Sequence, residues 1–325
     1  MERIVWKRVL VIAGVMLAIV LILRGWVFAC SAGGSDTGQP GDIKIEKTVS
    51  VYMEDTGQIR SMPVETYLEG VVAAEMPASF HVEALKAQAV AARTFTYKRI
   101  KDGGLINGAQ LSTDSTVCQA YDTDEECRKK WGASYAANMA RVRSAVEATA
   151  GEVMVYDGAL IDALYHAASG GKTEDSENVF AVAEPYLRSV VSDDEVGSSH
   201  TADEVRMTRK EFADAVNKAW PKAKLKASAL EKQVKVERRF ESGRVETIRL
   251  GNAKATGREL RGALELRSAW FTLTFTKNDV VIDTKGYGHG VGMSQAGANG
   301  MAQEGKNYRE ILRHYYTGVS IRTAG

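Results

Sequence analysis

Hydrophobic residues are concentrated first near the N-terminus. Val9 to Leu23 is an uninterrupted run of fifteen uncharged apolar residues, and Gly25 to Ala29 extends it beyond Arg24. A membrane-spanning helix needs about 20 residues. An arginine near a helix end can reach the lipid headgroups, so the pattern predicts one transmembrane helix over residues 9–29.

Basic residues Arg3, Lys7 and Arg8 precede this run. This flank predicts a cytoplasmic N-terminus and an exported remainder. A cleaved signal peptide is an alternative, although no A-x-A-like site follows the run. A lipidated Cys30 is another, because Val27-Phe28-Ala29-Cys30 resembles a lipobox apart from the bulky Phe28. All three alternatives place the rest of the chain outside the cytoplasm, and which of them applies stays open.

The segment after Cys30 divides the chain further. Ser31 to Asp42 is rich in Gly, Ser and Asp, without an apolar pattern, and predicts a flexible linker. The predicted organisation is therefore an anchor at 1–30, a linker at 31–42 and one domain at 43–325.

After the linker, apolar residues follow helical spacing in some segments and strand-like alternation in others. Helical spacing of apolar residues, or helix-forming composition, predicts helices at 63–77, 82–99, 124–150, 208–220, 256–264 and 308–316. Alternation and turn residues predict strands at 43–53, 151–156, 160–166, 233–239, 245–250, 270–276 and 280–283. The two types do not alternate regularly, so we expect an α+β fold with mixed sheets and flanking helices.

Composition narrows the function classes. Apolar residues make up 45% and charged residues 26%, as in a globular protein, which excludes a mostly disordered chain and a polytopic membrane protein. The net charge is +1, and residues 31–325 carry 38 basic and 40 acidic side chains. The chain therefore has no overall electrostatic basis for nucleic-acid binding.

Glu75 lies in the segment VVAAEMP that ends the first predicted helix. It follows Leu68, Val71 and Val72 at spacings of seven, four and three, which places its carboxylate on the apolar side of that helix. Burial raises a carboxyl pKa, and a glutamate that stays protonated near neutral pH can act as a general acid. The alternative is a glutamate that turns to solvent or pairs with a lysine.

Arg93 lies in the Ala-rich second helix, among small and apolar neighbours. A guanidinium in such surroundings needs an acceptor. A structural pair with an acidic residue and a role in substrate binding both remain open.

A glycine-rich segment, GYGHGVGMSQ, runs from Gly286 to Gln295. It matches neither the phosphate-binding loop nor the dinucleotide fingerprint. Alternating glycines indicate unusual backbone conformations or close approach. A polar loop that holds a sugar or peptide is one interpretation, and a tight crossing of strands is the other.

A polar segment, Tyr165 to Gly171 (YHAASGG), ends another predicted strand at a glycine turn, a position typical of a site rim. It contains His166 and Ser169, but the chain has no G-x-S-x-G elbow, which argues against a serine hydrolase.

Cys118 and Cys127 lie in the part predicted to be exported, where a disulfide between them is possible. Their spacing is not C-x-x-C and no histidine is near, so a metal site is the weaker alternative.

Taken together, these segments resemble the SpoIID family (stage II sporulation protein D), peptidoglycan lytic transglycosylases of spore-forming bacteria. The matching segments are Pro63 to Tyr97, TVCQAY at 116–121, HAASGGKTE at 166–174, PYLRSV at 185–190 and GYGHGVGMSQAG at 286–297.

The resemblance implies that Glu75 is the single catalytic acid and base. It would protonate the oxygen between N-acetylmuramic acid and N-acetylglucosamine and then deprotonate the muramic 6-hydroxyl, giving a 1,6-anhydro product. The residues implied for the glycan groove are Arg93, Tyr186, Tyr287, His166, His289, Ser294 and Gln295.

The resemblance also implies a setting. It predicts action on glycan strands stripped of stem peptides by a SpoIIP-like amidase, with other engulfment proteins, at the septal membrane and in the space around the forespore. It also implies that no cofactor is required. Some members bind a structural zinc near the Cys118 segment through a histidine that this chain lacks.

Two other function classes remain open at this stage. One is a non-catalytic cell-wall binding module that recruits or activates an amidase. The other is a hydrolytic muramidase or peptidase, for which a glycosidase would need a second carboxylate near Glu75. Glu174 and Asp175 are the candidates in a matching segment.

Overall fold

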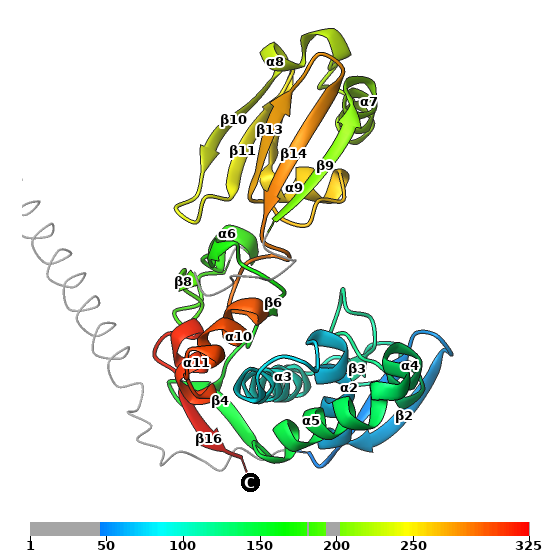
Figure 1. The fold of residues 1–325 in the computed structure, drawn as a ribbon, viewed down its shortest axis with the longest axis vertical. Helices are drawn as coiled ribbons and strands as arrows, with labels where there is room; N and C mark the ends of the chain where they lie inside the picture. The colour runs from blue at the N-terminus through cyan, green and yellow to red at the C-terminus, as the bar shows by residue number, and fades with distance from the viewer. Residues whose placement is uncertain (1–45, 181, 193–201, 325) are drawn as a thin grey trace, which may run out of the picture. The chain divides into compact units, whose positions relative to one another are not determined.

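The Ala-rich helix α3 (Val82–Asp102) lies at the centre of the larger of two hydrophobic cores in the part of the chain that the structure describes (Figure 1). The computed structural model describes residues 46–180, 182–192 and 202–324. In α3, the small side chains of Ala84, Ala87 and Ala91 are fully buried. They allow neighbouring elements to pack close to the helix, which contacts α2, α5, β4, α10 and α11.

Helices form most of this first core. They are α2 (Val64–Glu75), α3, α4 (Asp124–Trp131), α5 (Tyr135–Glu147), α10 (Gln295–Gln303) and α11 (Tyr308–Tyr315), with a 3-10 turn, η1 (Gly132–Ser134), between α4 and α5. Pro63 precedes α2, and Thr123 and Asn307 start α4 and α11 with capping boxes. These caps satisfy backbone N–H groups that would otherwise lack partners.

Short strands surround these helices. They are β1 (Thr48–Met53), β2 (Gln58–Pro63), β3 (Leu111–Ser112), β4 (Glu152–Tyr156), β5 (Ala159–Leu160), β6 (Tyr165–His166), β7 (Gly171–Lys172), β8 (Val191–Ser192), β15 (Met293–Ser294) and β16 (Ser320–Thr323), with the short helix α6 (Glu177–Phe180) between β7 and β8. The sheet β2-β1-β3 is mixed, because β1 pairs antiparallel with β2 and parallel with β3.

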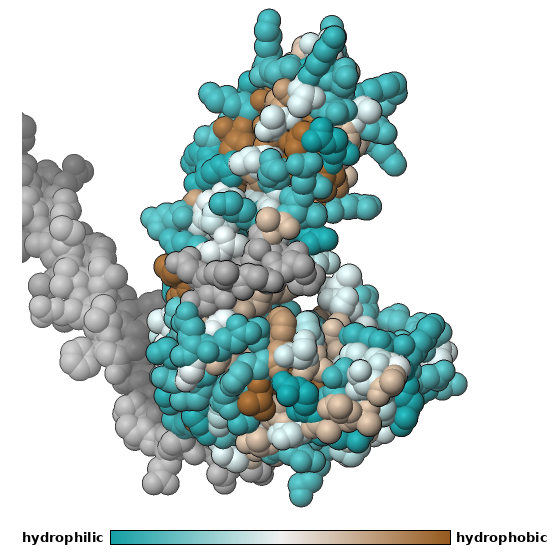
Figure 2. Space-filling view, in the orientation of Figure 1, coloured by the Kyte–Doolittle hydropathy of each residue, from teal (hydrophilic) through white to brown (hydrophobic). Residues whose placement is uncertain are grey.

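A second core is built from residues 202–285. Its elements are β9 (Ala202–Thr208), α7 (Arg209–Ala219), η2 (Ala227–Ala229), α8 (Leu230–Gln233), β10 (Val234–Arg239), β11 (Val245–Leu250), β12 (Ala253–Thr256), α9 (Gly257–Ala263), β13 (Phe271–Phe275) and β14 (Asp279–Lys285). They form the antiparallel sheets β10-β11-β12 and β13-β14-β9. Figure 2 shows apolar side chains among polar ones over these strands, at the top of the picture.

The predicted α+β class is confirmed, with several small sheets, some of them mixed. The hairpin around Asp157-Gly158 is present as β4 and β5, and Thr208 and Thr256 cap α7 and α9 as expected. The predicted strand at 160–166 is wrong in its middle, because β5 ends at Leu160 and β6 begins at Tyr165 and pairs with a distant segment.

The predicted transmembrane segment, residues 9–29, lies outside the described residues, as does the linker at 31–42. Across residues 46–180, 182–192 and 202–324, none of the helices has both the length and the apolar character needed to cross a membrane. The anchor, its alternatives and the domain division therefore stay predictions.

Candidate active site

Glu75 is the last residue of α2, and its side chain is partly buried. Leu68, Val71 and Val72 are fully buried on the same helix, as their spacing predicts. Burial raises the pKa of the Glu75 carboxyl above its ordinary value of 4.5, and the negative charge of Asp122 adds to the effect. Glu75 therefore has the environment of a carboxyl group that can hold a proton.

Three donors from separate parts of the chain reach this carboxyl group. The backbone N–H of Ala120 donates to Oε1 at 2.9 Å, and the Tyr165 hydroxyl lies 3.5 Å from the same oxygen. The side-chain amide of Gln295 donates to Oε2 at 3.3 Å. These hydrogen bonds stabilise the ionised form and partly offset the effect of burial on the pKa. Both protonation states of Glu75 therefore have partners.

Two buried glutamines support these donors. The Tyr165 hydroxyl donates to Oε1 of Gln119 at 2.8 Å, and Gln119 in turn donates to Thr96 at 3.1 Å. Gln295 also donates to Oε1 of Gln88 at 3.3 Å. Gln119, Gln88 and Thr96 have at most 3% of their surface exposed. Such a network fixes the positions of Tyr165 and Gln295 relative to Glu75.

Tyr165 is an uncharged partner of Glu75. Its burial and the nearby carboxylate raise its pKa well above the usual value of 10.0. A hydroxyl carries one proton, so Tyr165 can donate either to Gln119, at 2.8 Å, or to Glu75, at 3.5 Å. When Glu75 is protonated, its own O–H can donate to the Tyr165 oxygen. The pair is therefore suited to a carboxyl group that alternates between acid and base.

The glycine-rich segment brings Gln295 and Tyr165 close together. Gly286, Gly288, Gly290 and Gly292 all have positive φ, between 71° and 112°. A Cβ at Gly292 would lie 2.0 Å from the carbonyl oxygen of Leu164, so only glycine allows this approach. The segment then forms β15, which pairs parallel with β6. The expectation of unusual conformations and close approach is confirmed.

The predicted site residues differ in where they lie. Gln295 contacts Glu75 directly, whereas Ser294 is buried and caps α10 by accepting from the N–H of Gly297. Tyr287 is 41% exposed, pairs through its backbone with Ala168 and lies under the guanidinium of Arg267.

His166 and His289 pack together, with their ring centroids 5.5 Å apart. His166 follows Tyr165 on β6, and successive strand residues point to opposite faces. Its Nδ1 lies 3.1 Å from the carbonyl oxygen of Val291. Burial lowers the pKa of His166 well below 6.5 and that of His289 to about 4. Both rings are neutral at neutral pH, so neither is a ready proton donor.

Tyr186 is buried against β4 and β5 rather than beside Glu75. Its hydroxyl accepts from the N–H of Asp162 at 3.1 Å, and its ring packs on Tyr156 with centroids 5.6 Å apart. It supports the first core.

Arg93 is placed in the core, which favours the structural alternative over the groove position. Its side chain is fully buried, and it donates to the Glu65 carboxylate through two hydrogen bonds of 2.6 and 2.9 Å. Its remaining donors reach Thr149 and the carbonyl oxygens of Val146 and Glu152. Glu65 is ten residues before Glu75 in α2, about 15 Å along the helix axis at 1.5 Å per residue.

The possible disulfide is not formed, because Cys118 and Cys127 are both free thiols. Cys127 lies on α4 inside the first core, where burial raises its pKa to about 11, and Cys118 is half-buried in a loop. Zinc does not fit either. Within the described part of the chain, no three His, Cys, Asp or Glu side chains are grouped so that they could hold a metal ion.

The candidates for a second carboxylate are engaged elsewhere. Glu174 accepts from Ser242 and Asn178, and Asp175 pairs with Arg188. The acidic residue that acts on Glu75 is Asp122, which forms an ion pair of 2.9 Å with Lys130.

Sequence reasoning missed four members of the site, namely Gln88, Gln119, Ala120 and Tyr165. The segments TVCQAY and YHAASGG contain the last three, but composition alone does not show which of their side-chain or backbone groups belong to the Glu75 site. The alternation of β6 separates Tyr165 from His166, and that strand could not be placed without its partner β15.

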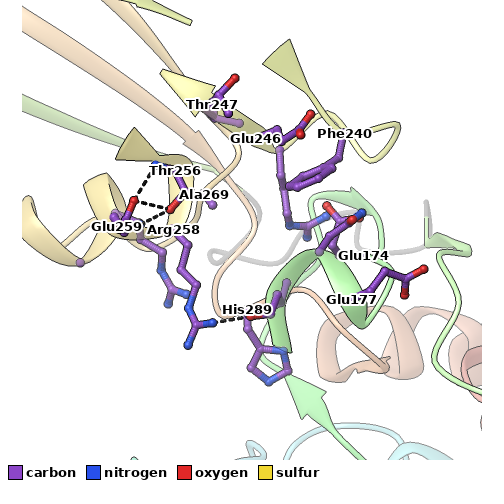
Figure 3. Close-up of a pocket in the computed structure, with 16 residues that line it drawn as sticks. Glu174, Glu177, Phe240, Glu246, Thr247, Thr256, Arg258, Glu259, Ala269 and His289 are labelled. Carbon is purple, nitrogen blue, oxygen red and sulfur yellow. Dashed lines mark hydrogen bonds between the residues drawn. The ribbon is translucent and has the colours of Figure 1, made fainter. Parts of the chain in front are cut away.

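A separate pocket of about 670 Å³ has in its wall His289, whose ring packs on that of His166 in β6 (Figure 3). Its wall includes His289, Glu174, Phe240, Arg258 and Arg261, and does not include Glu75.

Comparison with known proteins shows which family the chain resembles. A family model described as "Stage II sporulation protein" (SpoIID) matches residues 52–156. "Stage II sporulation protein D" of Bacillus subtilis (strain 168) is 35% identical over 279 residues, which cover 85% of this chain and 79% of the relative. The chain belongs to the SpoIID family.

Two further relatives are similar in sequence to this chain. "Stage II sporulation protein D" of Bacillus amyloliquefaciens is 35% identical over 285 residues, covering 85% of this chain and 79% of that protein. The "Amidase enhancer" of Bacillus subtilis (strain 168) is 30% identical over 301 residues, covering 78% of this chain and 40% of the relative. The SpoIID model match includes Glu75 and ends before Tyr165, so the site extends beyond the matched segment.

Proposed function

We propose that this SpoIID-family protein is a peptidoglycan lytic transglycosylase in which Glu75 is both the acid and the base. The observation that carries the proposal is the partly buried Glu75 carboxyl group, whose raised pKa favours the protonated form and whose partners suit both protonation states. A general acid works best when its pKa lies near the working pH.

In the first step, protonated Glu75 gives its proton to the glycosidic oxygen as the bond to muramic C1 breaks. N-acetylglucosamine leaves as an alcohol, and positive charge develops at C1. The Glu75 carboxylate that results is stabilised by the N–H of Ala120 and the amide of Gln295.

In the second step, this carboxylate takes the proton of the muramic 6-hydroxyl, whose oxygen bonds to C1. The 1,6-anhydro ring forms, Glu75 is protonated again, and no water is consumed. One carboxyl group is sufficient for this sequence, whereas most glycosidases that hydrolyse their substrates use two. The engagement of Glu174 and Asp175 elsewhere supports the single-carboxylate reaction.

We further propose that the protein acts during sporulation, outside the cytoplasm and anchored by residues 9–29, on strands from which an amidase has removed the stem peptides. Similarity to the "Amidase enhancer" supports an association with amidases. It also supports the second candidate, a binding module that recruits or activates an amidase without cleaving glycan.

Analysis of the products separates these functions. The full-length chain, purified in mild detergent, is incubated with isolated sacculi that have or have not been treated with an amidase, and the glycan ends are measured by mass spectrometry. We expect 1,6-anhydromuramic ends, more from the amidase-treated sacculi, and none with Glu75→Gln. Reducing ends would indicate a hydrolase, and glycan binding without cleavage would support the recruiting module.

A further inference from the structure

The pocket beside β6 has positive charge on one wall. Arg258 and Arg261 are three residues apart on α9, so their side chains lie on the same face of the helix. Figure 3 shows Arg258 extending from α9 towards His289. Arg258 donates to the carbonyl oxygen of Val179 and Arg261 to that of Leu266, the latter at 3.1 Å. Neither is ion-paired with a carboxylate of the described residues.

Two glutamates of the pocket wall are neutralised by arginines outside it, since Glu177 pairs with Arg188 and Glu246 with Arg238. Glu174 and Glu259 keep their charge, because Asn178, Ser242 and Thr256, which donate to them, are uncharged. The pocket wall also carries Arg244, so its three arginines outnumber these two glutamates. His289 is neutral, because burial and the charge of Arg261 lower its pKa to about 4. Arg258 and Arg261 are therefore cations with hydrogen-bonding capacity left for an anion.

The pocket adjoins the Glu75 site. His289 lines the pocket and also hydrogen-bonds to the backbone of Tyr165, whose hydroxyl contacts Glu75. His289 thus links the pocket wall to the strand that carries Tyr165. A volume of about 670 Å³ fits a ligand the size of one or two sugars, and the half-buried ring of Phe240 adds an apolar surface. Protein partners usually need a larger and flatter surface.

We propose that this pocket binds the free carboxylate of a peptide-free muramic acid residue, with Arg258 and Arg261 as its donors. The inference rests on the proposed function, because it takes glycan as the substrate. When an amidase cleaves the bond between the lactyl group and the stem peptide, it leaves one carboxylate on each muramic acid. A planar guanidinium pairs well with such a carboxylate. An intact strand carries an amide there, so the pocket would select stripped strands.

Binding measurements test this pocket directly. The full-length chain carrying Glu75→Gln, which prevents turnover, is titrated with peptide-free glycan oligosaccharides and with the same oligosaccharides after methyl esterification of the lactyl carboxylates. Arg258→Gln is the test variant, because Arg258 is exposed and its replacement leaves the core intact. Arg313→Gln removes one exposed positive charge from α11 and is the matched control.

We expect Arg258→Gln to weaken binding of the free-carboxylate oligosaccharides about tenfold, the loss of one charged hydrogen-bonding pair. Binding of the esterified oligosaccharides should not change, and Arg313→Gln should leave both affinities unchanged. An equal loss for the two ligands, or no loss for either, would overturn the proposal.

This result is independent of the reaction chemistry. If the wild type makes no anhydro ends while Arg258→Gln still selectively weakens binding of free-carboxylate glycan, the proposed transglycosylase activity fails and the pocket proposal stands. If anhydro ends form and Arg258→Gln does not change binding, the pocket proposal alone fails.

Discussion

The side-chain amide of Gln295 donates to the carboxylate of Glu75 at 3.3 Å, although the two residues are 220 positions apart in the chain. Glu75 ends α2, and Gln295, the last residue of the glycine-rich segment, begins α10. The four positive-φ glycines therefore have a chemical consequence, because they place an amide donor against the buried carboxyl group.

Tyr165→Phe tests how the Tyr165 hydroxyl contributes to the pKa of Glu75. Loss of the hydroxyl removes a hydrogen bond that lowers the pKa of Glu75, so that pKa should rise. We expect the alkaline limb of the pH–activity profile to move to higher pH. We also expect kcat to fall about tenfold, which corresponds to one hydrogen bond of about 1.4 kcal/mol.

Tyr308→Phe is the matched control, because it removes a tyrosine hydroxyl that contacts Glu152 instead of Glu75. It should leave the pH–activity profile unchanged. An unchanged profile for Tyr165→Phe would show that Tyr165 does not act on Glu75.

Glu75→Gln should stabilise the protein at neutral pH. Glu75 has a higher pKa in the folded protein than the ordinary 4.5, so the native state binds the proton more tightly than the unfolded state. This contribution to stability is full below pH 4.5 and is lost as the pH rises through the folded-state pKa. We therefore expect Glu75→Gln to exceed the wild type in free energy of unfolding at about pH 7, by a margin that shrinks towards about pH 5. Urea unfolding at several pH values measures this margin, and a margin independent of pH would contradict the raised pKa.

Glu65→Gln tests the structural assignment of Arg93. It leaves the fully buried guanidinium of Arg93 without its carboxylate partner, and we expect a loss of about 3 kcal/mol in the free energy of unfolding. The KM for glycan should stay near the wild-type value, because the pair lies away from Glu75. A large rise in KM with unchanged stability would instead favour the substrate-binding role.

The two cysteines should differ in reactivity. The thiol of Cys127 is buried and its pKa is raised to about 11, whereas Cys118 is half-buried. We expect iodoacetamide to modify Cys118 first in the folded protein, with Cys127 protected until unfolding. Peptide mass spectrometry follows both sites, and a disulfide-linked peptide spanning them would contradict the free thiols.

Local patterns predicted much of the fold. The apolar spacing of Leu68, Val71 and Val72 predicts both α2 and the burial of Glu75, because the helical period alone fixes which residues share a face. Thr208 and Thr256 mark helix starts through short-range capping.

The partners of Glu75 were harder to predict. Tyr165 and Ala120 reach it only through tertiary packing, so no sequence period links them. Of the predicted groove residues, Gln295 contacts Glu75, whereas Arg93 pairs with Glu65 in the core. Residue type did not distinguish a contact with Glu75 from a structural pair in the core, since Gln295 and Arg93 are both polar residues beside small neighbours.

The reaction performed in ¹⁸O-labelled water tests the central claim most directly. The full-length chain is incubated with amidase-treated glycan, and the new muramic ends are analysed by mass spectrometry, beside Glu75→Gln. Because the muramic 6-hydroxyl is the nucleophile, we predict anhydro ends that contain no ¹⁸O, and no new ends from the variant. Reducing ends carrying one ¹⁸O, or anhydro ends formed equally well by Glu75→Gln, would contradict Glu75 as the acid and base of a lytic transglycosylase.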